Sequence, residues 1–177
     1  TNFGTPLCDE PGCGLGTGTG PNSGSFWAWF GGVAAVEVGS VSQDVEISNG
    51  TAVLDFFLEI PVASGNGVDF VEVLIDGTQV WQVFENEPGF LTYAQVMVDV
   101  SAFADGGMHT LEIRSEITGV PAGTNFFIDD VNLTVTAGPG PDDGPPVIEV
   151  PTLGQVGGAA LLLLLLASGI VFLRRRG

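Results

Sequence analysis

The chain has 177 residues, 21 of them acidic and four basic, and a formal net charge of −17. Every acidic residue lies at or before Glu149. Residues 1–150 therefore contain 21 acidic residues and one basic residue, Arg114, and carry a net charge of −20. A surface of this sign repels nucleic acid and anionic lipid, which excludes both as ligands of this part of the chain. It fits a high-salt or calcium-containing exterior or a basic protein partner, and it also keeps a domain from self-associating.

Residues 1–25 are rich in glycine, threonine, proline and asparagine and predict an irregular arm. Cys8 and Cys13 are separated by four residues, and Pro11-Gly12 lies between them as a turn. Because the C-terminal pattern described below places the arm outside the cytoplasm, we expect a disulfide rather than a metal site or a redox pair. Export also requires a signal peptide, so we expect this numbering, which begins at Thr1, to start after its removal.

Residues 26–136 predict one all-β domain. The segment 51–60 alternates, with Ala52, Leu54 and Phe56 on one face and Thr51 and Asp55 on the other, as expected for a half-buried strand. Asn49-Gly50 and Asp76-Gly77 predict two-residue hairpins, 41–48 with 51–60 and 68–75 with 78–84. Further strands are expected at 91–100, 108–116 and 125–135, with one or two within 26–38. About eight short strands without a helix predict an antiparallel jelly-roll β-sandwich.

Three tryptophans are candidate ligand-binding or interface residues. Trp27 and Trp29 share one strand face, while Phe26 and Phe30 share the other. Large aromatic side chains in a small sandwich usually belong to its core, and we favour that interpretation. The alternatives are a sugar-stacking platform, to which Trp81 or Tyr93 would contribute, and a protein interface.

Catalysis is not expected from the titratable residues. His109 is in phase with inward-facing residues of its strand, which favours a structural histidine. The chain has no second histidine, no lysine and no serine in a nucleophile-elbow context. Acidic residues are numerous, but no pair of them is marked out for glycoside hydrolysis.

The C-terminal region predicts a linker and a membrane helix. Prolines and glycines make 137–150 a stiff, extended linker. In 151–177, eighteen uncharged residues from Val156 to Leu173 would span about 27 Å as a helix, close to the thickness of a bilayer core. Positive-inside bias places the following arginines in the cytoplasm and the β domain in the periplasm or outside. The residues expected to form this single-pass anchor include Val156, Leu161, Leu166, Leu173, Arg174, Arg175 and Arg176.

Several segments resemble known families. Residues 24–32, 39–47, 105–113 and 126–133 resemble jelly-roll domains of bacterial surface and secreted proteins, similar to carbohydrate-binding modules of families 4 and 22 and to galactose-binding-like folds. Val150-Pro-Thr-Leu153, the apolar run and the arginines resemble the IPTL-CTERM type of bacterial C-terminal sorting signal. The resemblance implies a β-sandwich held at the cytoplasmic membrane of a bacterium.

A structural Ca²⁺ is a further implication of this resemblance. Asp129 shares its phase with Phe127 and Val131, which places a carboxylate on the inward face, at a cost unless it is paired or binds a cation. Related jelly rolls use an aspartate of this closing strand as a calcium ligand, which implies a site at Asp129 or Asp130, with Glu37 and carbonyls of the arm. Alternatively, Asp129 accepts hydrogen bonds from loop amides or pairs with Arg114.

Three functions fit these observations. We expect first a non-catalytic accessory subunit that docks onto other proteins in an ordered membrane assembly, such as a bioenergetic complex. Its partners would be lipid, transmembrane helices of other subunits and basic extracytoplasmic proteins. The alternatives are a subunit of an extracellular filament with its hydrophobic helices in the core, and a cell-surface glycan-binding module.

Overall fold

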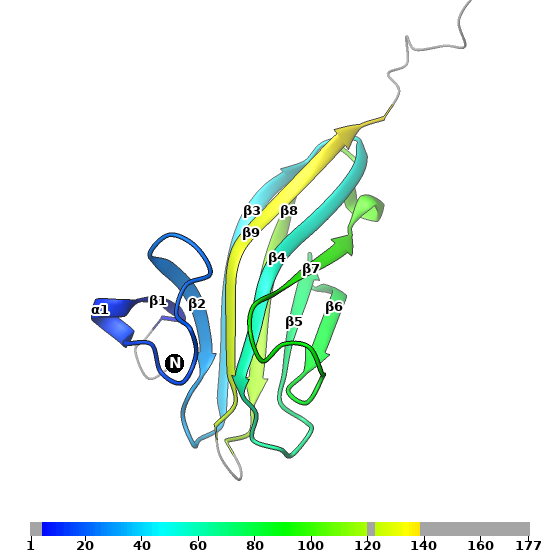
Figure 1. Ribbon diagram of the computed structural model, residues 1–177. Helices are drawn as coiled ribbons and strands as arrows, with labels where there is room; N and C mark the ends of the chain where they lie inside the picture. The colour runs from blue at the N-terminus through cyan, green and yellow to red at the C-terminus, as the bar shows by residue number, and fades with distance from the viewer. Residues whose placement is uncertain (1–4, 120–122, 139–177) are drawn as a thin grey trace, which may run out of the picture. The chain divides into compact units, whose positions relative to one another are not determined.

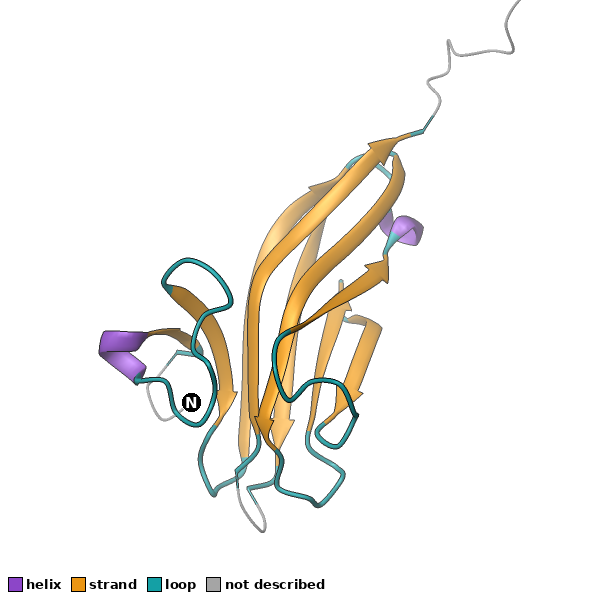
Figure 2. Ribbon diagram, in the orientation of Figure 1, coloured by secondary structure: helices purple, strands orange, loops and turns teal. Residues whose placement is uncertain are grey.

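The computed structural model describes residues 5–119 and 123–138, which belong to a unit that runs from Thr1 to Gly140. Strands dominate this part of the chain (Figures 1 and 2). In chain order the elements are β1 (Leu7–Asp9), α1 (Glu10–Cys13), β2 (Phe26–Gly31), β3 (Glu37–Ile47), β4 (Gly50–Val62), β5 (Phe70–Ile75), β6 (Thr78–Phe84), β7 (Ala94–Asp99), the 3₁₀ turn η1 (Ser101–Phe103), β8 (Gly107–Ile117) and β9 (Asn125–Ala137).

The strands form two antiparallel sheets that pack face to face. One sheet has five strands in the order β1-β2-β9-β4-β7, and the other has four in the order β3-β8-β5-β6. The predicted all-β sandwich is therefore confirmed.

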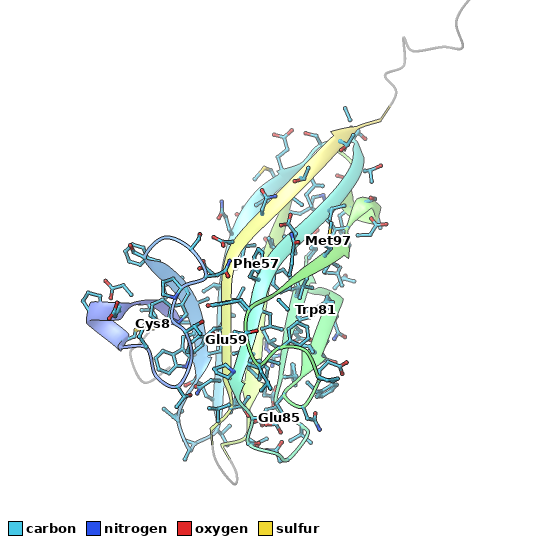
Figure 3. All side chains as sticks on the ribbon, in the orientation of Figure 1. Cys8, Phe57, Glu59, Trp81, Glu85 and Met97 are labelled. Carbon is cyan, nitrogen blue, oxygen red and sulfur yellow. A yellow bond between two sulfur atoms is a disulfide. The ribbon has the colours of Figure 1, made fainter. Side chains whose placement is uncertain are left out.

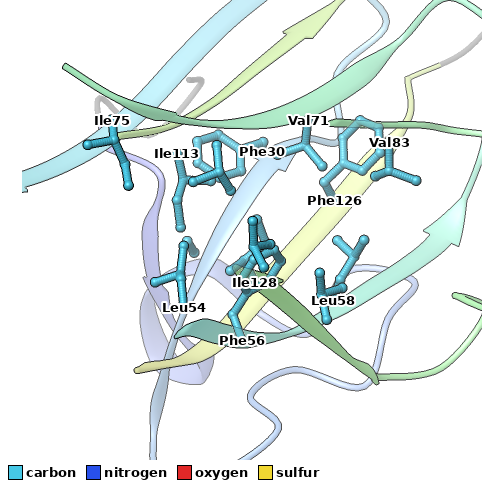
Figure 4. Packing of buried hydrophobic residues seen from close by; sticks show 14 of the residues in the cluster. Phe30, Leu54, Phe56, Leu58, Val71, Ile75, Val83, Ile113, Phe126 and Ile128 are labelled. Atoms are coloured by element: carbon cyan, nitrogen blue, oxygen red, sulfur yellow. The ribbon is translucent and has the colours of Figure 1, made fainter. Parts of the chain in front are cut away.

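The core lies between the sheets and follows from the alternation of β4. Its residues Ala52, Leu54, Phe56, Leu58 and Ile60 are all buried. They meet valines and isoleucines of β5 and β8 and the β9 residues Phe126 and Ile128 (Figure 4). Full burial of each Leu, Ile or Phe side chain contributes about 1.5–3 kcal/mol, so this interface is the main source of stability.

One of the two predicted hairpins is confirmed and the other is wrong. Asp76 and Gly77 both adopt positive φ and join Ile75 directly to Thr78, as expected for this dipeptide. Asn49-Gly50, in contrast, leads the chain from one sheet to the other: β3 pairs with β8, and β4 pairs with β9 and β7. The dipeptide favours a change of direction, but it does not select the strand that pairs with the one after it.

A β-bulge in β9 reverses which of its residues face the core. Asp55 lies opposite Asn132 and Phe57 lies opposite Asp129, so β9 has one residue more than β4 in this interval, and Asp130 has φ of 50°. Before the bulge Ile128 packs in the core, and after it Leu133 does. The predicted inward position of Asp129 is therefore wrong, because the strand does not keep one phase along its length.

The N-terminal arm covers part of the outer face of the five-stranded sheet. The predicted disulfide between Cys8 and Cys13 is confirmed, but the arm is not irregular throughout, since β1 pairs with β2 and the Asp9 side chain caps α1. Cys8, Trp27 and Phe127 form a second, smaller hydrophobic cluster between the arm and the sheet.

The predicted linker and membrane anchor lie almost wholly outside the described residues. Strand β9 continues to Ala137, so the first residue assigned to the linker belongs to the sandwich. The expected helix with its arginines, 151–177, falls outside the described residues. Within 5–119 and 123–138, no helix has the length and apolar character needed to cross a bilayer.

Candidate functional site

The outer face of the five-stranded sheet carries an open polar strip with one aromatic ring at its centre. Phe57 of β4 lies opposite Gln95 of β7 on one side and opposite Asp129 of β9 on the other. The next outward residue of β4, Asp55, lies between Met97 of β7 and Asn132 of β9. We call these six residues the β4 strip: Asp55, Phe57, Gln95, Met97, Asp129 and Asn132. Figure 3 shows Phe57 and Met97 on their neighbouring strands.

The alternation that builds the core also builds this strip. Phe56 and Leu58 point inward, so Phe57 must point outward, where it is half-buried. Met97 is 67% exposed. A large apolar surface thus lies beside polar side chains on a face that the arm leaves open.

Hydrogen bonds fix the polar side chains of the strip. Asp55 accepts one from Gln95 Nε2 at 3.2 Å and one from Asn132 Nδ2 at 3.0 Å. Asn132 Nδ2 also lies 3.0 Å from the Thr134 hydroxyl oxygen. Because both amide groups turn their NH₂ toward Asp55, their carbonyl oxygens are directed away from this carboxylate. The strip is therefore a preorganised set of acceptors around an aromatic ring.

The arm closes one end of the strip through the two neighbouring aspartates. Asp129 Oδ2 accepts hydrogen bonds from the backbone amides of Asn22 at 2.7 Å and Ser23 at 3.0 Å. Asp130 accepts from the Asn22 side-chain amide at 2.8 Å and from the Ser23 hydroxyl, and these two bonds hold the pKa of Asp130 below its usual value. Tyr93 donates to the Gly20 carbonyl at 2.7 Å. Burial, with the nearby charges of Asp129, Glu59 and Asp130, raises the pKa of Tyr93, so the donor stays protonated.

The structure does not gather the three residues suggested for calcium. Glu37 lies at the start of β3 and accepts a hydrogen bond from the Gly31 amide at 2.9 Å, whereas Asp129 and Asp130 bind the tip of the arm. Over the described ranges, no group of three or more His, Cys, Asp or Glu side chains could hold a metal ion. The alternative in which Asp129 accepts from loop amides matches its contacts. Arg114 pairs instead with Glu72 and Glu116, and calcium stays a prediction.

The three candidate tryptophans mainly serve packing. Trp27 is 2% exposed in the small cluster under the arm, and the half-buried Trp29 donates its Nε1 hydrogen to Asn125 at 2.8 Å. Trp81 packs edge-on against Phe56, with ring centroids 5.2 Å apart, and also lines a shallow hollow near Phe84. The aromatic residue at the centre of the open face, Phe57, was missed by sequence reasoning. The alternation of β4 was the signal that could have found it.

His109 lies away from the strip and is structural. Its Nδ1 lies 2.7 Å from Asp76 and its Nε2 lies 3.1 Å from Asp105. Hydrogen bonds to Asp76 and then Asp105 raise the pKa of His109. With both ring nitrogens occupied, His109 holds the β5–β6 turn to the start of β8.

A buried acidic network lies in the loops at the end of the sandwich where Glu85 is labelled (Figure 3). Glu85 accepts hydrogen bonds from the amides of Ser64, Gly65 and Gly67 and from the hydroxyls of Ser64 and Thr124. Burial alone would raise the pKa of Glu85, but these bonds outweigh it and hold the pKa below its usual value.

Asp69 belongs to the same network. It accepts from Thr118, Thr124 and Asn66, and its pKa is lowered in the same way, because its hydrogen bonds outweigh the effect of burial. The two carboxylates join the loop before β5 to the segments that flank β8 and β9.

Comparison with known proteins gives neither a family nor a curated relative, since no family model and no curated protein matches the chain. Among solved structures, similar chains include TmCBM61 in complex with β-1,4-galactotriose (21% identity, TM-score 0.47, 65% of this chain and 74% of that one). Also similar is a family 16 carbohydrate-binding module (16% identity, TM-score 0.46, 76% of this chain and 89% of that one). Another is Caldicellulosiruptor saccharolyticus CBM27-1 in complex with mannohexaose (10% identity, TM-score 0.45, 73% of this chain and 90% of that one). Similarities this distant transfer no ligand and no site to this chain.

Proposed function

We propose that this chain is a non-catalytic glycan-binding protein whose jelly-roll sandwich binds sugars on the β4 strip. The observation that carries the proposal is the half-buried Phe57 ring, flanked by fixed polar side chains on an otherwise open sheet face. The sheet orders β2-β9-β4-β7 and β3-β8-β5-β6 support the jelly-roll assignment, because sequential strands from β2 onward fall alternately in the two sheets except at the β5–β6 hairpin.

The chemistry of the strip suits an uncharged sugar. A pyranose ring presents C–H groups on its face, which pack on the negative face of an aromatic ring, and hydroxyl groups at its edge. Asp55 and the carbonyl oxygens of Gln95 and Asn132 supply acceptors for these hydroxyls. Three neighbouring strands make the strip about 10 Å wide, enough for a disaccharide.

The charge of the domain narrows the class of glycan. Residues 1–150 carry a net charge of −20, and two of the six strip residues are aspartates. Uronic-acid and sulfated polymers would be repelled at low salt. We therefore propose a neutral polysaccharide as the ligand.

The other parts of the chain fit this proposal as an anchor and a support. The apolar segment 156–173 and its arginines would hold the domain at the membrane of a bacterium, with the strip outside the cytoplasm. A Ca²⁺ near Asp129 and Asp130 would stiffen the arm tip that borders the strip. The accessory-subunit and filament hypotheses rest on the tail and the overall charge, whereas the glycan hypothesis rests on a defined group of side chains.

The experiment is affinity electrophoresis of the full chain in mild detergent, through gels that contain neutral galactan or mannan. We expect retardation by at least one polymer, and we expect Phe57→Ala to weaken binding at least tenfold, about 1.4 kcal/mol. Phe84→Ala is the matched control, because Phe84 is an exposed aromatic of the other sheet. Equal loss in both variants, or binding that survives Phe57→Ala, would place the site elsewhere. Release of new reducing ends would contradict the absence of catalysis.

A further inference from the structure

A second surface lies at the side of the sandwich, where two strand edges have no neighbouring strand among the described residues. In the described chain β3 is the end strand of its sheet and pairs with β8 alone, from Glu37 to Ile47. Strand β2 pairs with β9 only as far as Ile128, so from the bulge onward β9 pairs with β4 alone. Figure 1 shows the upper part of β9 extending well past the end of β2.

A groove of about 440 Å³ opens between these edges. Ile113 is a buried residue of this groove, while Leu7 and Val131 border it and are 60% and 45% exposed. We call it the edge groove; its lining is completed by Thr5, Pro6, Ser40, Val41, Ser42, Gln43 and Leu111. Unlike the β4 strip, it lies between the two sheets, and its lining by described residues includes no aromatic side chain.

The edge of β3 lacks three of the devices that usually block strand addition. Proteins protect free edges with lysine, proline, bulges or a covering segment. Strand β3 contains no lysine or proline, and its pairing with β8 is continuous over all eleven residues. An extended peptide could therefore add to this edge through main-chain hydrogen bonds and place alternate side chains in the groove.

The charges beside the groove select the occupant. Asp44 and Glu46 project from the exposed part of β3, and Glu112 follows the groove residue Leu111 on β8. Arg114 is the one basic residue of 1–150, and it is already paired with Glu72 and Glu116. A second copy of the chain brings the same negative charge to the contact and is repelled, whereas lysine or arginine side chains would be attracted.

We propose that the edge groove binds an extended, basic segment of a partner protein, which adds to β3 as a fifth strand. Apolar side chains on one face of that segment enter the groove beside Val131 and Val41. Basic side chains on its other face lie near Asp44 and Glu46. The edge groove is separate from the β4 strip, and this proposal does not depend on whether the β4 strip binds a glycan.

The test uses the full chain in mild detergent and fluorescent acetyl-(Val-Lys)4-amide as the probe, with binding measured by anisotropy. The matched peptides are (Val-Glu)4, which reverses the charge, and (Gly-Lys)4, which removes the apolar side chains. We expect (Val-Lys)4 to bind about tenfold more tightly than either. Hydrogen exchange should show new protection of β3 amides within 40–43.

The variant Val131→Asp separates groove binding from general attraction to an acidic protein. It adds a negative charge, so simple attraction would strengthen the binding of (Val-Lys)4, whereas loss of the apolar contact should weaken it about fivefold. Leu91→Asp, at a site 79% exposed outside the groove, is the control that adds the same charge.

Several results would overturn the proposal. They are equal binding of the three peptides, tighter binding by Val131→Asp, no protection within 40–43, and no binding at all. Sedimentation of a dimer that Val131→Asp dissociates would assign the groove to a second copy instead. Because Phe57→Ala should leave peptide binding unchanged, failure of the glycan proposal would remain distinguishable from failure of this one.

Discussion

Replacement of Glu85 by glutamine tests whether a buried carboxylate holds one end of the sandwich together. One carboxylate oxygen accepts from the amides of Ser64 and Gly65 and from the Thr124 hydroxyl. The other accepts from the Gly67 amide and the Ser64 hydroxyl. Glu85 is 3% exposed, so water cannot replace these bonds freely.

Glutamine keeps the shape of the side chain but has only one oxygen. If this oxygen takes the position with three donors, the NH₂ group faces the Gly67 amide and leaves that donor unsatisfied. An orphaned buried donor costs about 1–3 kcal/mol, and the remaining bonds lose the strength that the charge gave them. Together we expect Glu85→Gln to lower the free energy of unfolding by about 3 kcal/mol, or Tm by about 10 °C.

Thermal unfolding of the full chain in mild detergent, followed by near-UV circular dichroism, measures this loss. Glu87→Gln is the control, because Glu87 is exposed two residues away and should change Tm little. The pKa of Glu85 is lowered from 4.5, so its stabilising effect is present above that value and disappears as pH falls through the lower pKa of the folded protein. The difference between the variant and the parent should therefore shrink in acid. Equal stability of the two variants at pH 7 would refute the reasoning.

Three further predictions concern the arm and the histidine. Cys8→Ser should release β1 and α1 and cost about 2 kcal/mol of local stability, because the disulfide closes a short loop. Faster proteolysis of the arm would show this loss, and cleavage at the rate of the parent would contradict it. Gly18→Ala should undock the arm in the same assay, because a Cβ at Gly18 would overlap the Phe127 ring. Gly138→Ala is the comparison for an added methyl group, because its Cβ would make only an ordinary contact with Gly50 at 3.8 Å. His109→Gln should lower Tm most below pH 6.5, because the pKa of His109 is raised in the folded protein and the protonated imidazole stabilises the fold there. This stabilisation is lost as pH rises through the pKa of the folded protein, so a Tm difference that grows with pH would contradict the prediction.

Local pattern was enough to predict the strands of the sandwich from β2 onward and the disulfide of the arm. The alternation in 51–60 gave the core face of β4, because the side-chain period of a strand does not depend on its partners. Asp76-Gly77 and the two cysteines are also local signals, and both predictions were confirmed. What the pattern did not provide was strand pairing, since β3 lies beside a strand that begins sixty residues after its own end.

The residues of the proposed site were harder to predict, because their positions depend on two non-local features. The bulge at Asp130 moves Asp129 to the outer face, and no alternation rule shows where an extra residue will be inserted. The arm buries Trp27 against Phe127, so aromatic residues on an outer face became core. Phe57 lies on β4, one strand beyond the contacts of the arm with Asp129 and Asp130, and stays half-buried. Of the three tryptophans considered from the sequence, Trp27 is buried, and Trp29 and Trp81 are half-buried in packing contacts.

The attachment of the arm has a consequence for the order in which the domain folds. The Cys8–Cys13 disulfide joins residues only five positions apart and can form before the rest of the chain folds. The bonds from Asn22 to Asp129 and Asp130 join residues 107 and 108 positions apart, and they cannot exist until β9 has emerged and paired with β4. We therefore expect the arm, although it is synthesised before the strands that it covers, to be among the last elements to reach its final place. During that interval the ring of Phe127 and the whole outer face of the sheet stay open to water.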